Sequence, residues 1–97
     1  MPTFVSLLNW TDKGVANFKD TIRRSDDAKR AASGMGGTIR EILWTVGPYD
    51  LVVIADFPDD ASATAFLLAL GSAGNVRSTT LRGYSADEMS QIIAKVG

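Results

Sequence analysis

Three polar side chains of this sequence are of the types that transfer protons or hold anions. Tyr49 and Asp50 are adjacent in a turn, where they offer a phenol and a general base. Arg77 lies on a predicted strand, from which a guanidinium can bind a carboxylate or stabilise a developing oxyanion. Each also has a structural interpretation, because tyrosine packs its ring and aspartate accepts backbone hydrogen bonds in turns. Arg77 can instead form an ion pair, for which the candidates are Asp50, Asp56 and Glu41.

Four further side chains are of types that contact ligands. Asn9 and Asn75 stand at strand ends, where asparagine either satisfies local backbone groups or orients a ligand carbonyl. Trp10 and Trp44 either line a cavity between sheet and helices or belong to the core or a subunit interface. The candidate ligand set is therefore Asn9, Trp10, Trp44, Tyr49, Asn75 and Arg77, and the candidate catalytic set is Tyr49, Asp50 and Arg77.

The composition excludes most catalytic centres. The 97 residues include no cysteine and no histidine, so zinc–thiolate sites, thiol nucleophiles, Ser-His-Asp triads and haem ligation through histidine or cysteine are impossible. Carboxylates, phenols and guanidinium groups remain. The adjacent acidic residues at 26–27 and 59–60 are explained by helix starts. We therefore predict no metal site and no cofactor.

The charge distribution argues against polyanionic partners. Ten lysines and arginines oppose eleven acidic residues, and the arginines are scattered along the chain, so no basic stripe of the kind that binds nucleic acid is present. No apolar run approaches the roughly 20 residues that span a bilayer, and the N-terminus lacks the pattern of a signal peptide. We expect one domain over residues 1–97, located in the cytoplasm, without membrane contact.

The first half of the chain predicts a strand, a helix and a second strand. Residues 3–10 are rich in strand-forming side chains, with apolar groups on both faces. Thr11 is a plausible N-cap, and Val15, Phe18 and Ile22 are spaced as the buried stripe of a helix that ends at the glycines 34, 36 and 37. In the strand at 38–46, Ile39 and Leu43 are expected on one face and Ile42, Trp44 and Val46 on the other.

The second half predicts a hairpin, a buried helix, a polar strand and a short terminal helix. Residues 47–50 form a turn, and the nearly all-apolar segment 51–57 is typical of a central strand. The helix at about 60–73 is apolar nearly all round, which predicts burial nearly all round. Residues 75–84 form the fourth strand. A capping box at 85–88 then starts a helix with one apolar face, formed by Met89, Ile92, Ile93 and Val96.

This order of elements is the α+β ferredoxin-like βαββαβ arrangement with an added C-terminal helix. Right-handed crossovers put both main helices on one face of a four-stranded antiparallel sheet. The other face stays uncovered although three strands carry large apolar groups on both faces, and a large apolar surface is rare on a monomer. We therefore predict an obligate homodimer packed sheet to sheet, with higher assembly through the second helix as an extension.

The segments at 8–14, 44–52 and 74–82 resemble the GYD-domain family of small bacterial and archaeal proteins. The family takes its name from a Gly-x-Tyr-Asp turn, matched here by Gly47, Tyr49 and Asp50, and the resemblance extends over essentially the whole chain. It implies a dimeric α+β barrel. It implies little about activity, because the family is functionally uncharacterised, and related dimeric barrels include cofactor-independent monooxygenases, lactone isomerases, haem proteins and effector-binding domains.

Three hypotheses about function follow. The first is a homo-oligomeric binding or regulatory module that takes a small aromatic or anionic molecule. The second is a cofactor-independent oxygenase or isomerase in which Asp50 or Tyr49 handles a proton and Arg77 stabilises an oxyanion. The third is a purely structural assembly unit. A cavity of about 300 Å³ or more reached by Arg77 and Tyr49 would favour a ligand or catalysis.

Overall fold

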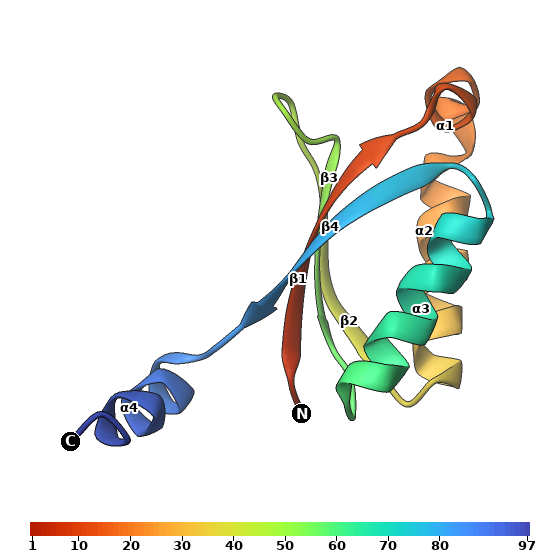
Figure 1. Cartoon of the computed structure of the whole chain (residues 1–97). Helices are drawn as coiled ribbons and strands as arrows, with labels where there is room; N and C mark the ends of the chain where they lie inside the picture. The colour runs from red at the N-terminus through yellow and green to blue at the C-terminus, as the bar shows by residue number, and fades with distance from the viewer.

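The computed structural model describes residues 1–97. Its elements are β1 (Thr3–Trp10), α1 (Asp12–Ala16), the 3-10 helix η1 (Phe18–Asp20), α2 (Thr21–Gly34), β2 (Thr38–Trp44), β3 (Leu51–Asp56), α3 (Asp60–Ser72), β4 (Val76–Gly83) and α4 (Ala86–Ala94). The strands form one antiparallel sheet in the order β2-β3-β1-β4, and α2 and α3 lie on the same side of it (Figure 1). The predicted ferredoxin-like α+β fold is confirmed. None of the helices is long and apolar enough to cross a membrane.

The sheet has one covered face and one uncovered face. Directly paired residues point to the same side of a sheet, so the pairing register assigns every strand position to a face. The face turned away from α2 and α3 is called the open face here. Its members are Thr3, Val5, Leu7, Asn9, Thr38, Glu41, Leu43, Val52, Ile54, Asp56, Arg77, Thr79, Leu81 and Gly83. Its centre is apolar, as the sequence predicts.

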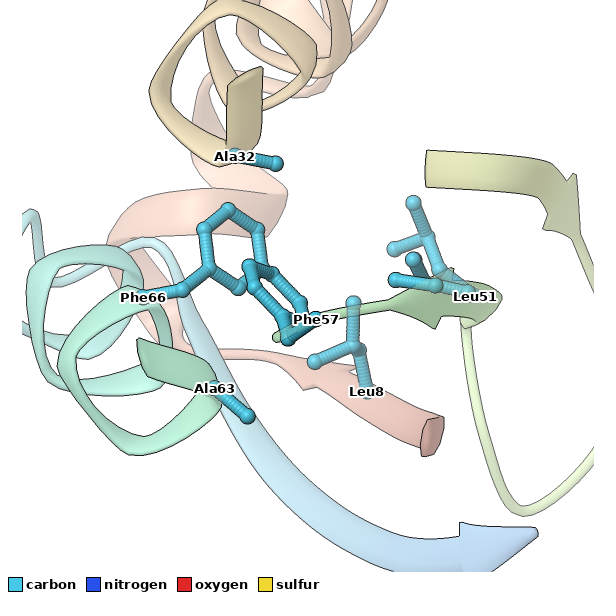
Figure 2. Packing of buried hydrophobic residues seen from close by; sticks show 8 residues of the cluster. Leu8, Ala32, Leu51, Phe57, Ala63 and Phe66 are labelled. Carbon is cyan, nitrogen blue, oxygen red and sulfur yellow. The ribbon is translucent and has the colours of Figure 1, made fainter. Parts of the chain in front are cut away.

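The hydrophobic core lies between the covered face and the two helices. Phe57, directly after β3, is 1% exposed, and its ring packs at 5.2 Å between centroids against the ring of Phe66 from α3. Figure 2 shows this aromatic pair between Leu8 of β1, Ala32 of α2 and Ala63 of α3. Burying two aromatic rings this way contributes about 2 kcal/mol or more for each side chain. The pair therefore joins α3 to the centre of the sheet.

The helix predicted over residues 11–34 is broken in the structure. Thr11 does cap α1, accepting a hydrogen bond from the Gly14 N–H at 3.1 Å. Asn17, the residue after α1, donates its side-chain amide to the Lys13 carbonyl at 2.9 Å, a side-chain bond to the backbone that competes with helix continuation. The break changes the rotational orientation of α2 about its own axis, and with it the side chains that face the sheet. The predicted buried stripe of Val15, Phe18 and Ile22 is wrong, because these side chains are 49%, 52% and 58% exposed.

A β-bulge in β2 changes the predicted assignment of its faces. Ile39 pairs with Ala55 and Glu41 with Ile54, so one extra residue, Arg40, is inserted between them. The expectation that Ile39 shares a face with Leu43 is wrong. Ile39 joins Ile42 and Trp44 on the covered face. The bulge also places Arg40 beside Asp56, with the arginine Nε 3.1 Å from the carboxylate.

The helix α3 is buried on one side only. Ala63 and Phe66 are buried and Leu67 and Leu70 are partly buried, so these four residues form the inner stripe of the helix. The expectation of burial nearly all round is wrong for the single chain, because Leu68 on the outer side is 70% exposed. A single sheet can cover only one side of a helix. The outer apolar edge of α3 is therefore an uncovered surface of this chain.

The terminal helix α4 stands apart from the rest of the chain. Figure 1 shows it at the end of β4, away from α2 and α3. The predicted capping box is present: Ser85 Oγ accepts from the Glu88 N–H at 3.1 Å, and the Glu88 carboxylate accepts from the Ser85 N–H at 2.9 Å. The hydrogen bond from the Ser85 N–H to the carboxylate lowers the pKa of Glu88. The apolar face of α4 is exposed along its length, with Ile93 at 61% and Val96 at 85%.

Acid is expected to weaken the start of α3. Asp59 caps this helix by accepting from the Ser62 N–H at 2.7 Å, and this bond lowers the pKa of Asp59 below the ordinary value of 3.8. A lowered folded-state pKa stabilises the protein above the unfolded-state pKa, and the gain is lost as pH falls through the lowered pKa. Asparagine caps helices without titrating. Denaturant unfolding of Asp59→Asn should therefore depend less on pH between about pH 5 and about pH 2 than unfolding of the wild type. Parallel curves for the two proteins would contradict this prediction.

Candidate functional site

A cavity of about 340 Å³ lies between the covered face of the sheet and the helices α2 and α3. Its walls are mainly apolar, with Leu8, Trp10, Leu51, Val53, Phe66 and Val76 among the contributing residues. This volume is within the range of small-molecule sites in proteins. The cavity therefore meets the size condition stated above, but neither Arg77 nor Tyr49 lines it, so the second part of that condition is not met.

The cavity exists because α2 directs small and polar side chains at the sheet. Thr21, Arg24, Ser25 and Ala28 line it and are half-buried, whereas the larger Ile22 points outward and is exposed. A helix packed for stability alone would place its large apolar side chains inward. The rotational orientation of α2 thus leaves the space between this helix and the sheet open.

Beside the cavity, α1 packs against the loop between α3 and β4. The Thr11 N–H donates to the Asn75 carbonyl at 3.0 Å, and the Thr11 hydroxyl donates to the Gly74 carbonyl at 2.5 Å. Gly14 lies directly on this loop: a Cβ atom there would be 1.9 Å from the Asn75 carbonyl oxygen. Only glycine permits so close an approach. Ala73 and Asn75 of this loop line the cavity.

Arg24 is hydrogen-bonded to α1. One of its terminal nitrogens, Nη2, donates to the Gly14 carbonyl at 3.2 Å. Ion pairs to carboxylates are made by four of the six arginines, namely Arg23, Arg30, Arg40 and Arg82. Arg24 makes none. A half-buried guanidinium without a counter-charge therefore faces a largely apolar cavity.

Two of the residues singled out in the sequence line this cavity. Trp10 and Asn75 both contribute to its walls. Trp44 lies on the same face of the sheet, and its indole N–H donates to the Thr21 hydroxyl at 3.0 Å. Trp44 is not among the lining residues. The aromatic wall of the cavity is thus Trp10 together with Phe66.

The hairpin residues have structural contacts. The Asp50 carboxylate accepts from the Trp10 backbone N–H at 2.9 Å, which ties the hairpin to the end of β1. The Tyr49 carbonyl accepts from the Thr45 hydroxyl at 2.6 Å. Asn9 donates to the Pro48 carbonyl at 2.7 Å, so it satisfies a local backbone group. None of these three candidates lines the cavity.

Arg77 lies on the open face, paired with Asn9 across the β1–β4 ladder. It is exposed and forms no ion pair within the chain, so the pairings with Asp50, Asp56 and Glu41 do not form there. The structure therefore separates the sequence candidates. Trp10 and Asn75 are at the cavity, while Asn9 and Arg77 are on the other side of the sheet.

No set of side chains of the kind that binds metals comes together in the fold. Groups of three or more carboxylates at coordinating distance are absent. The two carboxyl groups whose pKa is lowered, Asp59 and Glu88, cap helices, and neither lines the cavity. The charged side chains that do line it are Arg23, Arg24 and Asp27.

Arg24, Thr21 and Ser25 line the cavity although the sequence patterns did not single them out. They fall outside the apolar stripe that was assigned to the buried side of the helix. The available signal was the weakness of that stripe beyond Ile22, where polar residues continue the same helical face. A helix whose inner face becomes polar while its neighbours stay apolar either frays or lines a polar site.

The chain resembles known proteins along nearly its whole length. A family model described as "GYD domain" matches residues 4–93. The "Glutamine synthetase and cystathionine beta-lyase binding protein" of Thermus thermophilus is 29% identical over 90 residues, which cover 92% of this chain and 95% of that protein. Among solved structures, the C-terminal domain of the MgtC protein from Mycobacterium tuberculosis matches with a TM-score of 0.55 at 16% identity, covering 88% of this chain and 89% of that one. This last similarity concerns the fold alone.

Proposed function

The chain belongs to the GYD-domain family, and from that premise we propose that it is a homo-oligomeric module that binds a small molecule between its sheet and helices and acts as a binding or regulatory protein. The observation that carries the proposal is the 340 Å³ cavity. A chain of this size has few large apolar side chains with which to fill its core. Nevertheless, α2 directs Thr21, Ser25 and Ala28 at the sheet instead of Ile22. Ligand binding explains that arrangement.

Self-association is supported by how much surface the single chain leaves exposed. Only 11 of the 97 residues are buried, and the accessible surface is 6188 Å², against about 5400 Å² for a compact monomer of this mass. The radius of gyration is 14.5 Å, against about 12.5 Å for a compact chain of this length. The open face and the apolar side of α4 account for much of this surface. A second copy placed on the open face would cover its apolar centre.

A role in binding other proteins is supported by the relative from Thermus thermophilus. Its name describes a protein that binds two enzymes, glutamine synthetase and cystathionine beta-lyase. The exposed apolar side chains of Val15, Phe18 and Ile22 offer a surface separate from the open face. In this proposal, ligand occupancy of the cavity regulates binding of an enzyme at such a surface.

Filling the cavity tests the proposal. In a thermal-shift screen with a metabolite library, bound ligands should raise the melting temperature of the wild type, because a ligand stabilises the folded state by mass action. In Ala28→Leu, whose larger side chain occupies the cavity, the same compounds should cause little or no shift. The matched control is Ala65→Leu, which adds the same atoms on the exposed side of α3 and should respond like the wild type. Equal shifts in all three proteins, or no compound that shifts the wild type, would overturn the proposal.

A further inference from the structure

Arg24 holds a positive charge with no carboxylate partner at a cavity whose walls are mainly apolar. From this we infer that the cavity takes an organic anion, with an apolar body of about the size of one aromatic ring and one carboxylate-like group bound by Arg24. The inference rests on the proposed function, since it names the chemical class of ligand for the same cavity.

Among the charged side chains that line the cavity, Arg24 is the only one that forms no ion pair. Asp27, the only carboxylate that lines the cavity, is shared by Arg23, at 3.8 Å, and by Arg30. Arg23 also reaches Asp20 at 3.6 Å. Removing a charge from water without a partner is unfavourable. A ligand that brings a negative charge to Arg24 therefore gains more than a neutral ligand of the same shape.

The hydrogen bonds around the cavity also concentrate recognition on Arg24. Ser25 donates its hydroxyl to the Ile22 carbonyl at 2.7 Å, and the Thr21 hydroxyl accepts from Trp44. Arg24 makes one hydrogen bond, to the Gly14 carbonyl, out of the five N–H donors of a guanidinium. The remaining donors have the forked geometry that fits a carboxylate.

The cavity that Arg24 lines also contains an apolar wall and a second polar group. Arg24 donates to the Gly14 carbonyl, and Gly14 packs on the backbone of Asn75, so Arg24 and Asn75, which both line the cavity, also both border α1. Trp10 pairs with Val76, the residue after Asn75. An anion bound by Arg24 would thus share the cavity with Asn75 and with the Trp10 ring. The 340 Å³ volume is at the small end of ligand sites, which suits a single ring rather than a nucleotide.

Phenylacetate and its neutral isostere phenylacetamide test the inference. Calorimetric titration should show that the wild type binds phenylacetate about tenfold more tightly than phenylacetamide, because hydrogen bonds to charged groups are roughly twice as strong as neutral ones. Both compounds should shift the indole N–H signal of Trp10 in NMR spectra of isotope-labelled protein. In Arg24→Gln, phenylacetate affinity should fall to that of phenylacetamide while phenylacetamide affinity stays unchanged. Arg24→Lys, which keeps the charge, should restore part of the preference.

The control variant is Arg30→Gln, on the same helix, exposed and outside the cavity; it should keep the preference for the acid. Equal affinity of the wild type for phenylacetate and phenylacetamide overturns the anion assignment and leaves the proposed function standing. A preference for phenylacetate that persists in Arg24→Gln overturns the role of Arg24. If neither compound moves the Trp10 signal at millimolar concentration, the anion assignment is wrong, and the proposed function fails with it only if the metabolite screen also yields no ligand.

Discussion

Leu7→Glu should convert the homodimer that we propose, of twice 10.4 kDa, to a monomer of 10.4 kDa. Leu7 lies on the open face, directly opposite Val52 of β3 and next to the β4 strand. If a second copy covers this face, each glutamate carboxylate would lose its water without gaining a partner. The penalty for one unpaired buried charge is about 3–5 kcal/mol, and a two-fold dimer contains the substitution twice. Light scattering after size-exclusion chromatography at low micromolar concentration measures the mass directly.

The control for this experiment is Leu68→Glu, the same exchange on the outer side of α3. Leu68 is 70% exposed and belongs to α3, which lies on the other side of the sheet from the open face (Figure 1), so the variant should keep the dimeric mass. If instead the wild type forms larger assemblies and Leu68→Glu reduces them to dimers, α3 provides the higher assembly. A dimer that survives Leu7→Glu would exclude the open face as the interface. Far-ultraviolet circular dichroism distinguishes a folded monomer from an unfolded chain.

The parts of the fold that depend on local patterns could be predicted from the sequence. Alternating apolar residues identified the strands, and short-range hydrogen bonds of Thr11 and Ser85 placed the starts of α1 and α4. The bulge at Arg40 and the break at Asn17 could not be predicted. The bulge is defined by the pairing of β2 with β3, and nothing within β2 itself marks the extra residue. Asn17 is equally compatible with the middle of a long polar helix.

The same break explains why the polar side of the cavity could not be predicted. A continuous helix over residues 11–34 would turn Val15, Phe18 and Ile22 towards the sheet and fill the space that the structure leaves open. Because Asn17 interrupts the helix, α2 presents Arg24 and Thr21 instead. Trp10 and Asn75 could be recognised as ligand candidates because their positions depend on strand alternation and strand ends. The side of a helix that meets a sheet depends on tertiary packing, which a single sequence does not display.

Gly14→Ala should destabilise the protein by about 3 kcal/mol or more. The added Cβ atom would be 1.9 Å from the Asn75 carbonyl oxygen and 2.9 Å from its carbonyl carbon. Both are backbone atoms, so no side-chain rotation can relieve the clash, and α1 or the loop at residues 73–75 must move. Movement would stretch the hydrogen bonds from Thr11 to Gly74 and Asn75. For a domain of this size the melting temperature should fall by roughly 12–24 °C.

Gly34→Ala is the matched control, because a Cβ atom at this helical position meets nothing within 4 Å. Alanine is the better helix former, so this variant should equal the wild type or gain up to about 1 kcal/mol. Urea unfolding of the three proteins gives the free energies, and similar values for both variants would show that the contact between α1 and the loop yields easily. Arg24 is tied to the Gly14 carbonyl, so a displaced α1 also moves the guanidinium. A folded Gly14→Ala protein should therefore lose its preference for phenylacetate over phenylacetamide, although the alanine side chain at position 14 contacts neither compound.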